Sequence, residues 1–181
     1  MSNVIRIGVI GAGGNTRAKH IPGFQAIPGV KVTAVCNRTQ ASGERVAKEF
    51  GIATVTENWR DIIESPEIDA VCIGTWPNLH GKLATAALRA GKHVLTEARM
   101  ARNLAEAEMM HGESLANPNL VAQIVPAPMS LPFDATIIGL LQNGTLGELR
   151  EVFLIATSDS LADSSLPLSW RQDFSLSGKN T

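Results

Sequence analysis

Short apolar runs of strand length alternate along this chain with segments that have the periodicity of helices. The runs are VIRIGVI, VKVTAVC, DAVCIGT, HVLTE and LVAQIVP, and stretches such as SGERVAKEF and LHGKLATAALRA separate them. Strands joined through helices of this length pair in parallel through right-handed crossovers. The runs show little polar alternation, as strands covered by helices on both faces require. The pattern therefore predicts an α/β fold with a doubly wound parallel sheet.

The strand and helix pattern divides the chain into two parts. A first domain of residues 1–125 is expected to close before the PAP turn. Residues 126–181 contain one predicted helix, LPFDATIIGLLQNG, ended by Gly144, one predicted strand, LREVFLIAT, and a Ser-rich loop over residues 157–169. A lone strand has no partner for its edges, and so short a segment builds no core of its own. We therefore expect residues 126–181 to be the start of a second α/β domain that is incomplete in this chain.

The charge and composition of the chain exclude several classes of partner. It carries 16 Lys and Arg against 17 Asp and Glu, and no stretch concentrates basic residues, so we expect neither a nucleic acid nor an anionic membrane surface as partner. No segment has the ~18 apolar residues of a membrane span and the N-terminus lacks a signal-peptide pattern, which predicts a cytoplasmic protein. Cys36 and Cys72 lie in apolar runs without metal-ligand spacing, which predicts reduced core residues and no metal site.

A glycine-rich turn, GAGGNT, follows the first predicted strand and precedes the first predicted helix. Gly11 permits a tight turn, and Gly13 lets backbone N–H groups approach a pyrophosphate at the positive end of the helix. Gly14 and Asn15 join them as candidate cofactor-binding residues. Thr16 stands at the third glycine position of this motif, which predicts a helix slightly farther from the sheet. A turn that needs glycine only for its backbone geometry is the alternative, but the order of strand, turn and helix favours a Rossmann domain that binds a dinucleotide.

The end of the second predicted strand carries the residues expected to select the cofactor. In Rossmann domains an acidic residue there binds the ribose 2′-hydroxyl and repels a 2′-phosphate. Here the strand ends in Asn37-Arg38-Thr39, with no carboxylate before Glu44. We predict that neutral Asn37 removes the repulsion, that Arg38 faces the phosphate, and that Thr39 adds a hydroxyl while capping the next helix. NADP is therefore the expected cofactor, and NAD is the alternative if Arg38 is only a solvated residue at a helix start.

Together with two further motifs, these segments resemble one family. GAGGNTRAKHIPGF, AVCNRT, TWPNLH and AGKHVLTEARMA are similar to segments of the Gfo/Idh/MocA oxidoreductases, and the resemblance covers essentially the whole chain. It implies an NAD(P)-dependent enzyme that transfers a hydride to or from a sugar- or polyol-like molecule. It also implies a C-terminal domain that forms the substrate site and, in many members, the oligomer interface. For this chain we expect a homo-oligomer assembled through that domain, with the substrate half mostly absent.

The loop after the fourth predicted strand departs from the family pattern at one position. The family has Thr-Pro-x-x-x-His there; Thr75 and His80 keep that spacing, Trp76 takes the proline position and Pro77 follows. The resemblance implies that these four residues contact the cofactor. A histidine in the first turn of a helix can equally be a solvated residue, but the spacing favours a His80 that faces the ligand at the carboxyl edge of the sheet.

The loop after the fifth predicted strand departs further, because the family's Glu-Lys-Pro is Glu97-Ala98-Arg99 here. The lysine that family members place near cofactor and substrate is therefore Ala98. Arg99 can orient a ligand, but its guanidinium stays protonated and is a poor general acid. A carboxylate at this edge is costly unless it is paired or used, so Glu97 is a candidate cofactor-binding residue, and His80, Glu97 and Arg99 are the candidate catalytic residues. His20 stays open between a packing role and a site role.

Three interpretations of function remain open. The first is a hydride-transfer oxidoreductase, in which the cofactor supplies the chemistry and the protein supplies orientation. The second is a non-catalytic dinucleotide-binding sensor, which the missing lysine favours. The third is a catalytic protein of which these residues only bind the nucleotide. All three predict that this chain binds a dinucleotide, and we expect negligible dehydrogenase activity on polyols.

Overall fold

The computed structural model describes residues 4–125, 133–153, 155, 157, 159 and 162–178. The chain divides after Val125 into two compact units, and its residues from Ser169 onward belong to the first unit. The C-terminal residues differ from the prediction, because the short helix α7 (Phe174–Ser177) packs against a helix of the first unit, α4 (Pro77–Arg89).

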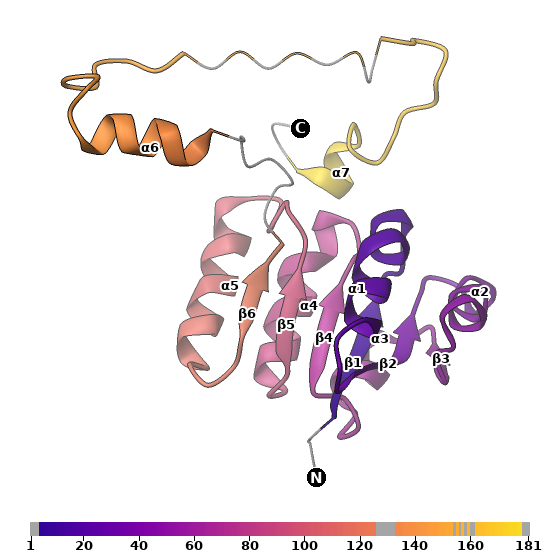
Figure 1. Ribbon diagram of the computed structural model, residues 1–181. Coiled ribbons are helices and arrows are strands. Elements are labelled where there is room, and N and C mark those ends of the chain that lie inside the picture. Colours follow the sequence, from indigo (N-terminus) through magenta and orange to yellow (C-terminus); the bar gives the residue numbers. More distant parts are fainter. Residues whose placement is uncertain are drawn as a thin grey trace. The chain divides into compact units, whose positions relative to one another are not determined.

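Six parallel strands form the sheet of the first unit, in the order β3-β2-β1-β4-β5-β6 (Figure 1). The strands are β1 (Ile5–Ile10), β2 (Val30–Cys36), β3 (Thr54–Thr56), β4 (Ala70–Ile73), β5 (His93–Thr96) and β6 (Ala122–Ile124). The chain builds outward from β1 through β2 to β3, then returns to the other side of β1 with β4. The strand order therefore reverses between β1 and β4, where ligands of doubly wound sheets bind at the carboxyl ends. The predicted doubly wound Rossmann fold is confirmed.

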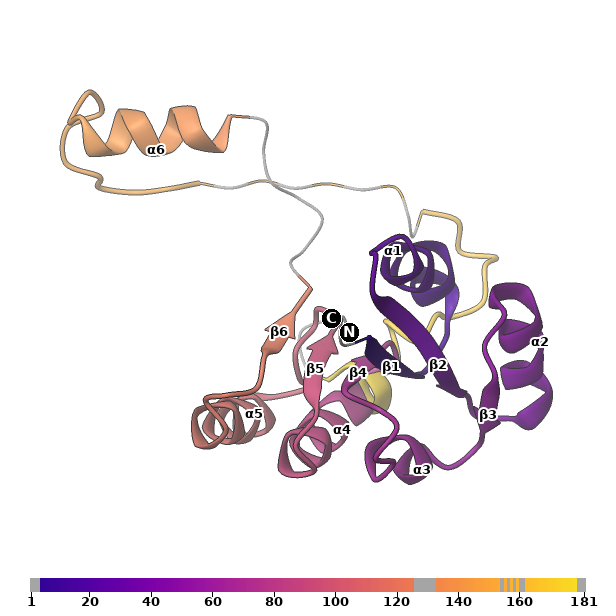
Figure 2. The ribbon, with the colours of Figure 1, turned by 60° about the horizontal axis from the view of Figure 1, so that its bottom comes forward.

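Helices cover both faces of the sheet (Figure 2). The helices of the first unit are the π-helical segment η1 (Thr16–His20), α1 (Ile21–Gln25), α2 (Gln40–Phe50), α3 (Trp59–Ile63), α4 and α5 (Leu104–Ala116). In Figure 2, α3, α4 and α5 lie along one face, and α1 lies on the opposite face. This two-sided cover explains why the strands lack polar alternation.

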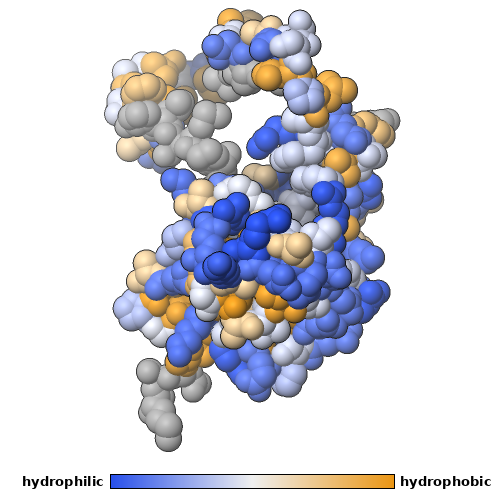
Figure 3. Space-filling view, turned by 90° about the vertical axis from the view of Figure 1, so that its right-hand side faces the viewer, coloured by the Kyte–Doolittle hydropathy of each residue, from blue (hydrophilic) through white to orange (hydrophobic). Residues whose placement is uncertain are grey.

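The exterior of the first unit is polar on the side seen in Figure 3, where hydrophilic residues dominate and hydrophobic ones are scattered. Among the described residues, no helix combines the length and the apolar character needed to cross a bilayer. The described residues also contain no cluster of three or more His, Cys, Asp or Glu side chains that could hold a metal ion.

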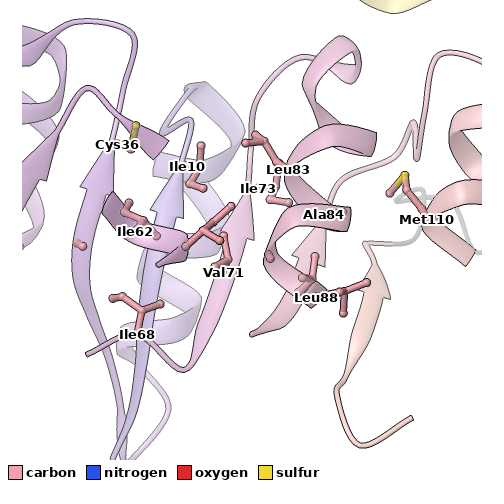
Figure 4. Close-up of a cluster of buried hydrophobic side chains, with 14 residues drawn as sticks. Ile10, Cys36, Ile62, Ile68, Val71, Ile73, Leu83, Ala84, Leu88 and Met110 are labelled. Carbon is pink, nitrogen blue, oxygen red and sulfur yellow. The ribbon is translucent and has the colours of Figure 1, made fainter. Parts of the chain in front are cut away.

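The sheet separates two apolar clusters, one under each helix layer. Successive residues of a strand point to opposite faces, so Val71 and Ile73 join the cluster beneath α3, α4 and α5, which Figure 4 shows, while Cys72 joins the cluster beneath α1 and α2. Cys36 and Cys72 are both free and buried, as predicted. Burial raises the pKa of the Cys36 thiol to about 11 and that of the Cys72 thiol to about 12, so both stay protonated at neutral pH.

The second unit contains the predicted helix, and the described residues of the predicted strand do not lie in a strand. Helix α6 (Asp134–Gln142) ends before Gly144, whose φ is +75°; residues 131–132 of the predicted helix lie outside the described residues. The described residues of 149–157 form no strand pairing. The strand prediction is wrong for these residues, because an apolar run becomes a strand only when a neighbour completes its hydrogen bonds. Phe153 and Ile155 are accordingly exposed.

Amide exchange should separate the two units. We expect residues 149–153 to exchange at close to the unprotected rate, because none of them lies in a helix or strand. The amides of β1 and β4, which lie inside the sheet, should exchange only through global unfolding. Hydrogen exchange read by mass spectrometry on a sample shown to be monomeric measures both. Slow exchange of residues 149–153 in that monomer would show that they are protected within the chain.

Candidate cofactor-binding site

The glycine turn leaves β1 in a conformation that only glycine adopts without strain. Gly11 has a φ of +87°, and a Cβ atom there would lie 2.7 Å from Cγ2 of Thr75 and 2.9 Å from the carbonyl carbon of Gly74. The outer side of the turn is open, because a Cβ at Gly14 would have no atom within 4 Å. Helical structure starts at Gly14 and continues into η1. An open turn at a helix start is the cradle that a pyrophosphate requires.

Thr16 replaces the third glycine of the motif, and the space for its side chain is provided by the end of β4. The Thr16 side chain is fully buried. A Cβ atom at Gly74 would overlap the Thr16 hydroxyl and lie 2.5 Å from the carbonyl oxygen of Gly11. Gly74, at the end of β4, therefore lets the turn and its helix approach the strand. Sequence reasoning missed Gly74, although a glycine that ends an apolar run is a signal of close backbone approach.

Asn37, the neutral residue predicted to remove the repulsion of a 2′-phosphate, faces inward. Its side chain is 9% exposed, Oδ1 accepts a hydrogen bond of 2.8 Å from the backbone N–H of Ala12, and Nδ2 donates one of 2.9 Å to Oγ of Ser42. Both polar groups of the amide are thus used within the protein. Asn37 joins the glycine turn to α2, and its contribution at the cofactor site is the absence of a negative charge.

The next two residues lie on the surface beside the turn. Thr39 is the N-cap of α2, and its Oγ1 accepts a hydrogen bond of 3.3 Å from the N–H of Ser42, which confirms the predicted cap. The Arg38 guanidinium carbon lies 5.6 Å from the centre of the Trp76 ring, within the range of a cation–π interaction. This contact joins the loops after β2 and β4. No local pattern predicts it, because the two residues are far apart in the sequence.

His80 is buried, which corrects its predicted role as a residue that faces the ligand. It is 1% exposed, with Nδ1 2.8 Å from the carbonyl oxygen of Arg99 and Nε2 2.9 Å from that of Thr75. Both ring nitrogens therefore face backbone oxygens, one from each of the loops after β4 and β5. Trp76 caps α4 and is 38% exposed, while Pro77 occupies the first turn of the helix and is buried. Of these loop residues, Trp76 is the one that presents a large exposed side chain.

The loop after β5 brings Glu97 against the helix of the glycine turn. Glu97 Oε1 accepts a hydrogen bond of 2.8 Å from Nδ2 of Asn15 and lies 2.7 Å from Nε2 of His20. The hydrogen bond with His20 lowers the pKa of Glu97 below its usual value; burial opposes this effect and the Asn15 bond adds to it. Ala98 is exposed, and the Arg99 guanidinium donates to the carbonyl oxygen of Ser177 at 3.4 Å. The structure thus gives His20 a place in the site.

The loops that carry these residues follow the carboxyl ends of the parallel strands, and they therefore lie at one edge of the sheet, the upper one in Figure 1. The family model for an oxidoreductase family with an NAD-binding Rossmann fold matches residues 5–121. The chain belongs to the Gfo/Idh/MocA oxidoreductase family. The resemblance deduced from the motifs is therefore confirmed, and with it the class of fold and of nicotinamide cofactor that the family uses.

Relatives that are named for an activity are similar to the chain over part of their own sequences. It is 31% identical to a levoglucosan dehydrogenase of Pseudarthrobacter phenanthrenivorans, over 96% of this chain and 46% of that protein. It is 37% identical to an inositol 2-dehydrogenase/D-chiro-inositol 3-dehydrogenase of Shouchella clausii, over 61% of this chain and 34% of that protein. The chain therefore spans less than half the length of either relative.

Solved structures of oxidoreductases are also similar to the chain over part of their own length. KijD10, a 3-ketoreductase from Actinomadura kijaniata solved in complex with NADP and TDP-benzene, superimposes with a TM-score of 0.69 and 29% identity, over 81% of this chain and 44% of that one. An oxidoreductase domain protein from Kribbella flavida superimposes with a TM-score of 0.79 and 28% identity, over 98% of this chain and 49% of that one. The chain therefore shares its fold with oxidoreductase structures over most of its own length.

Proposed function

We propose that this chain binds NADP(H) at the carboxyl edge of its sheet and serves a hydride-transfer oxidoreductase that acts on a sugar- or polyol-like molecule. The observation that carries the proposal is the open glycine turn at the reversal point of the strand order, with Arg38 on its flank. The turn suits the pyrophosphate. Arg38 is the group that suits a 2′-phosphate.

The electrostatics around Arg38 favour the phosphorylated cofactor. An acidic residue at the end of β2 would favour NAD by repelling the phosphate, and the residue there is neutral Asn37. Among the described residues, no carboxylate forms a salt bridge with Arg38. Its guanidinium is therefore available for a charge-assisted contact with a ligand. The NADP bound to KijD10, a structural neighbour, supports the same choice, and NAD stays the alternative.

The names of the relatives support the substrate class. They include dehydrogenases of levoglucosan and inositol and a reductase of a dTDP-linked sugar. When bound, the cofactor supplies the hydride chemistry. The residues of this chain bind the pyrophosphate at Gly11, Gly13 and Gly14, hold the adenosine end near Arg38 and Trp76, and place Glu97 and Arg99 at the edge where a substrate is met. We propose that the segment after Val125 starts the domain that selects the substrate and forms a homo-oligomer.

A second candidate function is supported by Ala98. The family's lysine stands at this position, and alanine has no proton to give, so a dinucleotide-binding sensor without catalysis is the alternative. Cofactor binding alone is compatible with both functions. Turnover of a sugar or polyol by a protein that contains this chain and its second domain decides between them.

The test of the proposed function is a titration of this chain with NADPH and with NADH, read by nicotinamide fluorescence. We expect both to bind and NADPH to bind more tightly. We also expect negligible dehydrogenase turnover of myo-inositol or glucose by the chain alone, since the family lysine is absent. Failure of both nucleotides to bind would refute the proposed function, and tighter binding of NADH would refute the choice of cofactor.

A further inference from the structure

The two carboxylate oxygens of Glu97 have different surroundings. Oε1 accepts a hydrogen bond of 2.8 Å from Nδ2 of Asn15 and lies 2.7 Å from Nε2 of His20. Among the described residues, no hydrogen bond reaches Oε2, and the Glu97 side chain is 21% exposed. An ionised carboxylate accepts hydrogen bonds through both oxygens and donates none. Oε2 can therefore accept a hydrogen bond from a donor that does not belong to the described residues.

His20 is held in place by its own surroundings. Its side chain is 11% exposed and its ring lies beside that of Phe24, with centroids 6.5 Å apart. It is the last residue of η1, one helical turn past Asn15, so both side chains reach the same carboxylate from one helix. The half-buried imidazole, whose Nε2 lies 2.7 Å from Oε1 and 3.3 Å from Nδ2 of Asn15, restricts the rotation of the Glu97 carboxyl group. The result is one fixed orientation of Oε2.

We propose that His20 is the positioning residue of Glu97, and that it holds the carboxylate so that Oε2 accepts a hydrogen bond from a ribose hydroxyl of the bound dinucleotide. The identity of the ligand rests on the proposed function, whereas the role of His20 toward Glu97 does not. A hydroxyl is the donor that suits this oxygen, because the phosphates of a dinucleotide are anionic at neutral pH and are repelled by a carboxylate.

The proposal predicts a specific pH dependence. The charged and titratable groups that face Glu97 are His20 on η1, His80 on α4 and Cys72 on β4. The His20 hydrogen bond is the largest cause of the lowered pKa of Glu97. The ionised acceptor exists above that pKa and is lost as the pH falls through it. Without His20 the pKa rises toward its usual value, so the acceptor is lost at a higher pH.

The first measurement needs no ligand. The side-chain carboxyl carbon of Glu97 is titrated by NMR in the parent protein, in His20→Leu and in His20→Gln, and Glu97→Gln assigns the signal. We expect the midpoint to rise by roughly half a pH unit or more in His20→Leu. We expect a smaller rise in His20→Gln, whose amide can still donate, and none in the control His111→Gln, which changes an exposed histidine of α5. An unchanged midpoint in a folded His20→Leu or His20→Gln protein overturns the role of His20.

The second measurement is NADH affinity as a function of pH in the same proteins, because NADH lacks the 2′-phosphate, which itself titrates with a second pKa of about 6. We expect the loss of affinity toward acid pH to begin at a higher pH in His20→Leu, and to vanish in Glu97→Gln, whose neutral amide does not titrate. Acid loss that persists in Glu97→Gln overturns the ribose contact. If the parent protein binds neither NADPH nor NADH, the proposed function fails, and the carboxyl titration still decides the role of His20.

Discussion

Replacing Gly74 by alanine should destabilise the first unit by about 3 kcal/mol or more, at or beyond the upper end of the usual ~1–3 kcal/mol cost of overpacking a core. The added methyl group would overlap the Thr16 hydroxyl and lie 2.5 Å from the carbonyl oxygen of Gly11. Neither neighbour can turn away, because the threonine is fully buried and the oxygen belongs to the backbone. The glycine turn would have to move away from β4, and we expect dinucleotide binding to be lost with it.

Urea unfolding followed by circular dichroism measures this effect, and Gly14→Ala is the matched control. A Cβ at Gly14 meets no atom within 4 Å, and the residue is helical and exposed. The control should therefore change stability by no more than ~1 kcal/mol, the difference in helix propensity between the two residues. It should still weaken NADPH binding if the phosphates approach the turn closely. Equal stability of the two variants would mean that Gly74 is not the close contact described above.

Arg38→Ala should weaken NADPH binding by about 1.5–3 kcal/mol, the usual contribution of a hydrogen bond to a charged group, and leave NADH binding nearly unchanged. The effect should be selective for NADPH, because only NADPH carries the 2′-phosphate that the guanidinium would contact. Fluorescence titration of both cofactors measures it. The loss should shrink as salt is added, since the contact is exposed to solvent.

The chain offers a matched control for Arg38. Arg60 also lies over a tryptophan, with its guanidinium carbon 4.4 Å from the Trp59 ring centre, but it belongs to α3 and lies outside the candidate site. Arg60→Ala therefore removes the same charge and the same kind of ring contact, and should leave both affinities unchanged. An equal loss for NADPH and NADH in Arg38→Ala would assign Arg38 to the shared part of the two cofactors.

The fold was predictable because its signals are local. Apolar runs, helix periods and the glycine turn each occupy a short window, and their order leaves one common solution, the doubly wound sheet. The cap at Thr39 was predictable for the same reason. The run at residues 149–157 was not, because strand formation there depends on a partner, and a window of sequence does not show one.

The site was less predictable, because its contacts join loops that are distant in the sequence. The spacing placed His80 and Asn37 in the correct loops, but whether a loop side chain points outward or inward depends on what the neighbouring loop offers it. Asn37 turns inward to the N–H of Ala12, and His80 to two carbonyl oxygens. The partnership of His20 with Glu97 needed the three-dimensional arrangement as well.

Among the described residues, the hydrogen bonds of the buried His80 ring go to backbone atoms, the carbonyl oxygens of Thr75 and Arg99. A contact of this kind is indifferent to which side chains those neighbours carry, since every amino acid brings the same carbonyl group. The conformation that these hydrogen bonds give the two loops therefore does not depend on the chemistry of the loop side chains. An exchange of the residues beside the histidine, at position 98 for example, would therefore keep the geometry of the loops while the reactivity of the site changed.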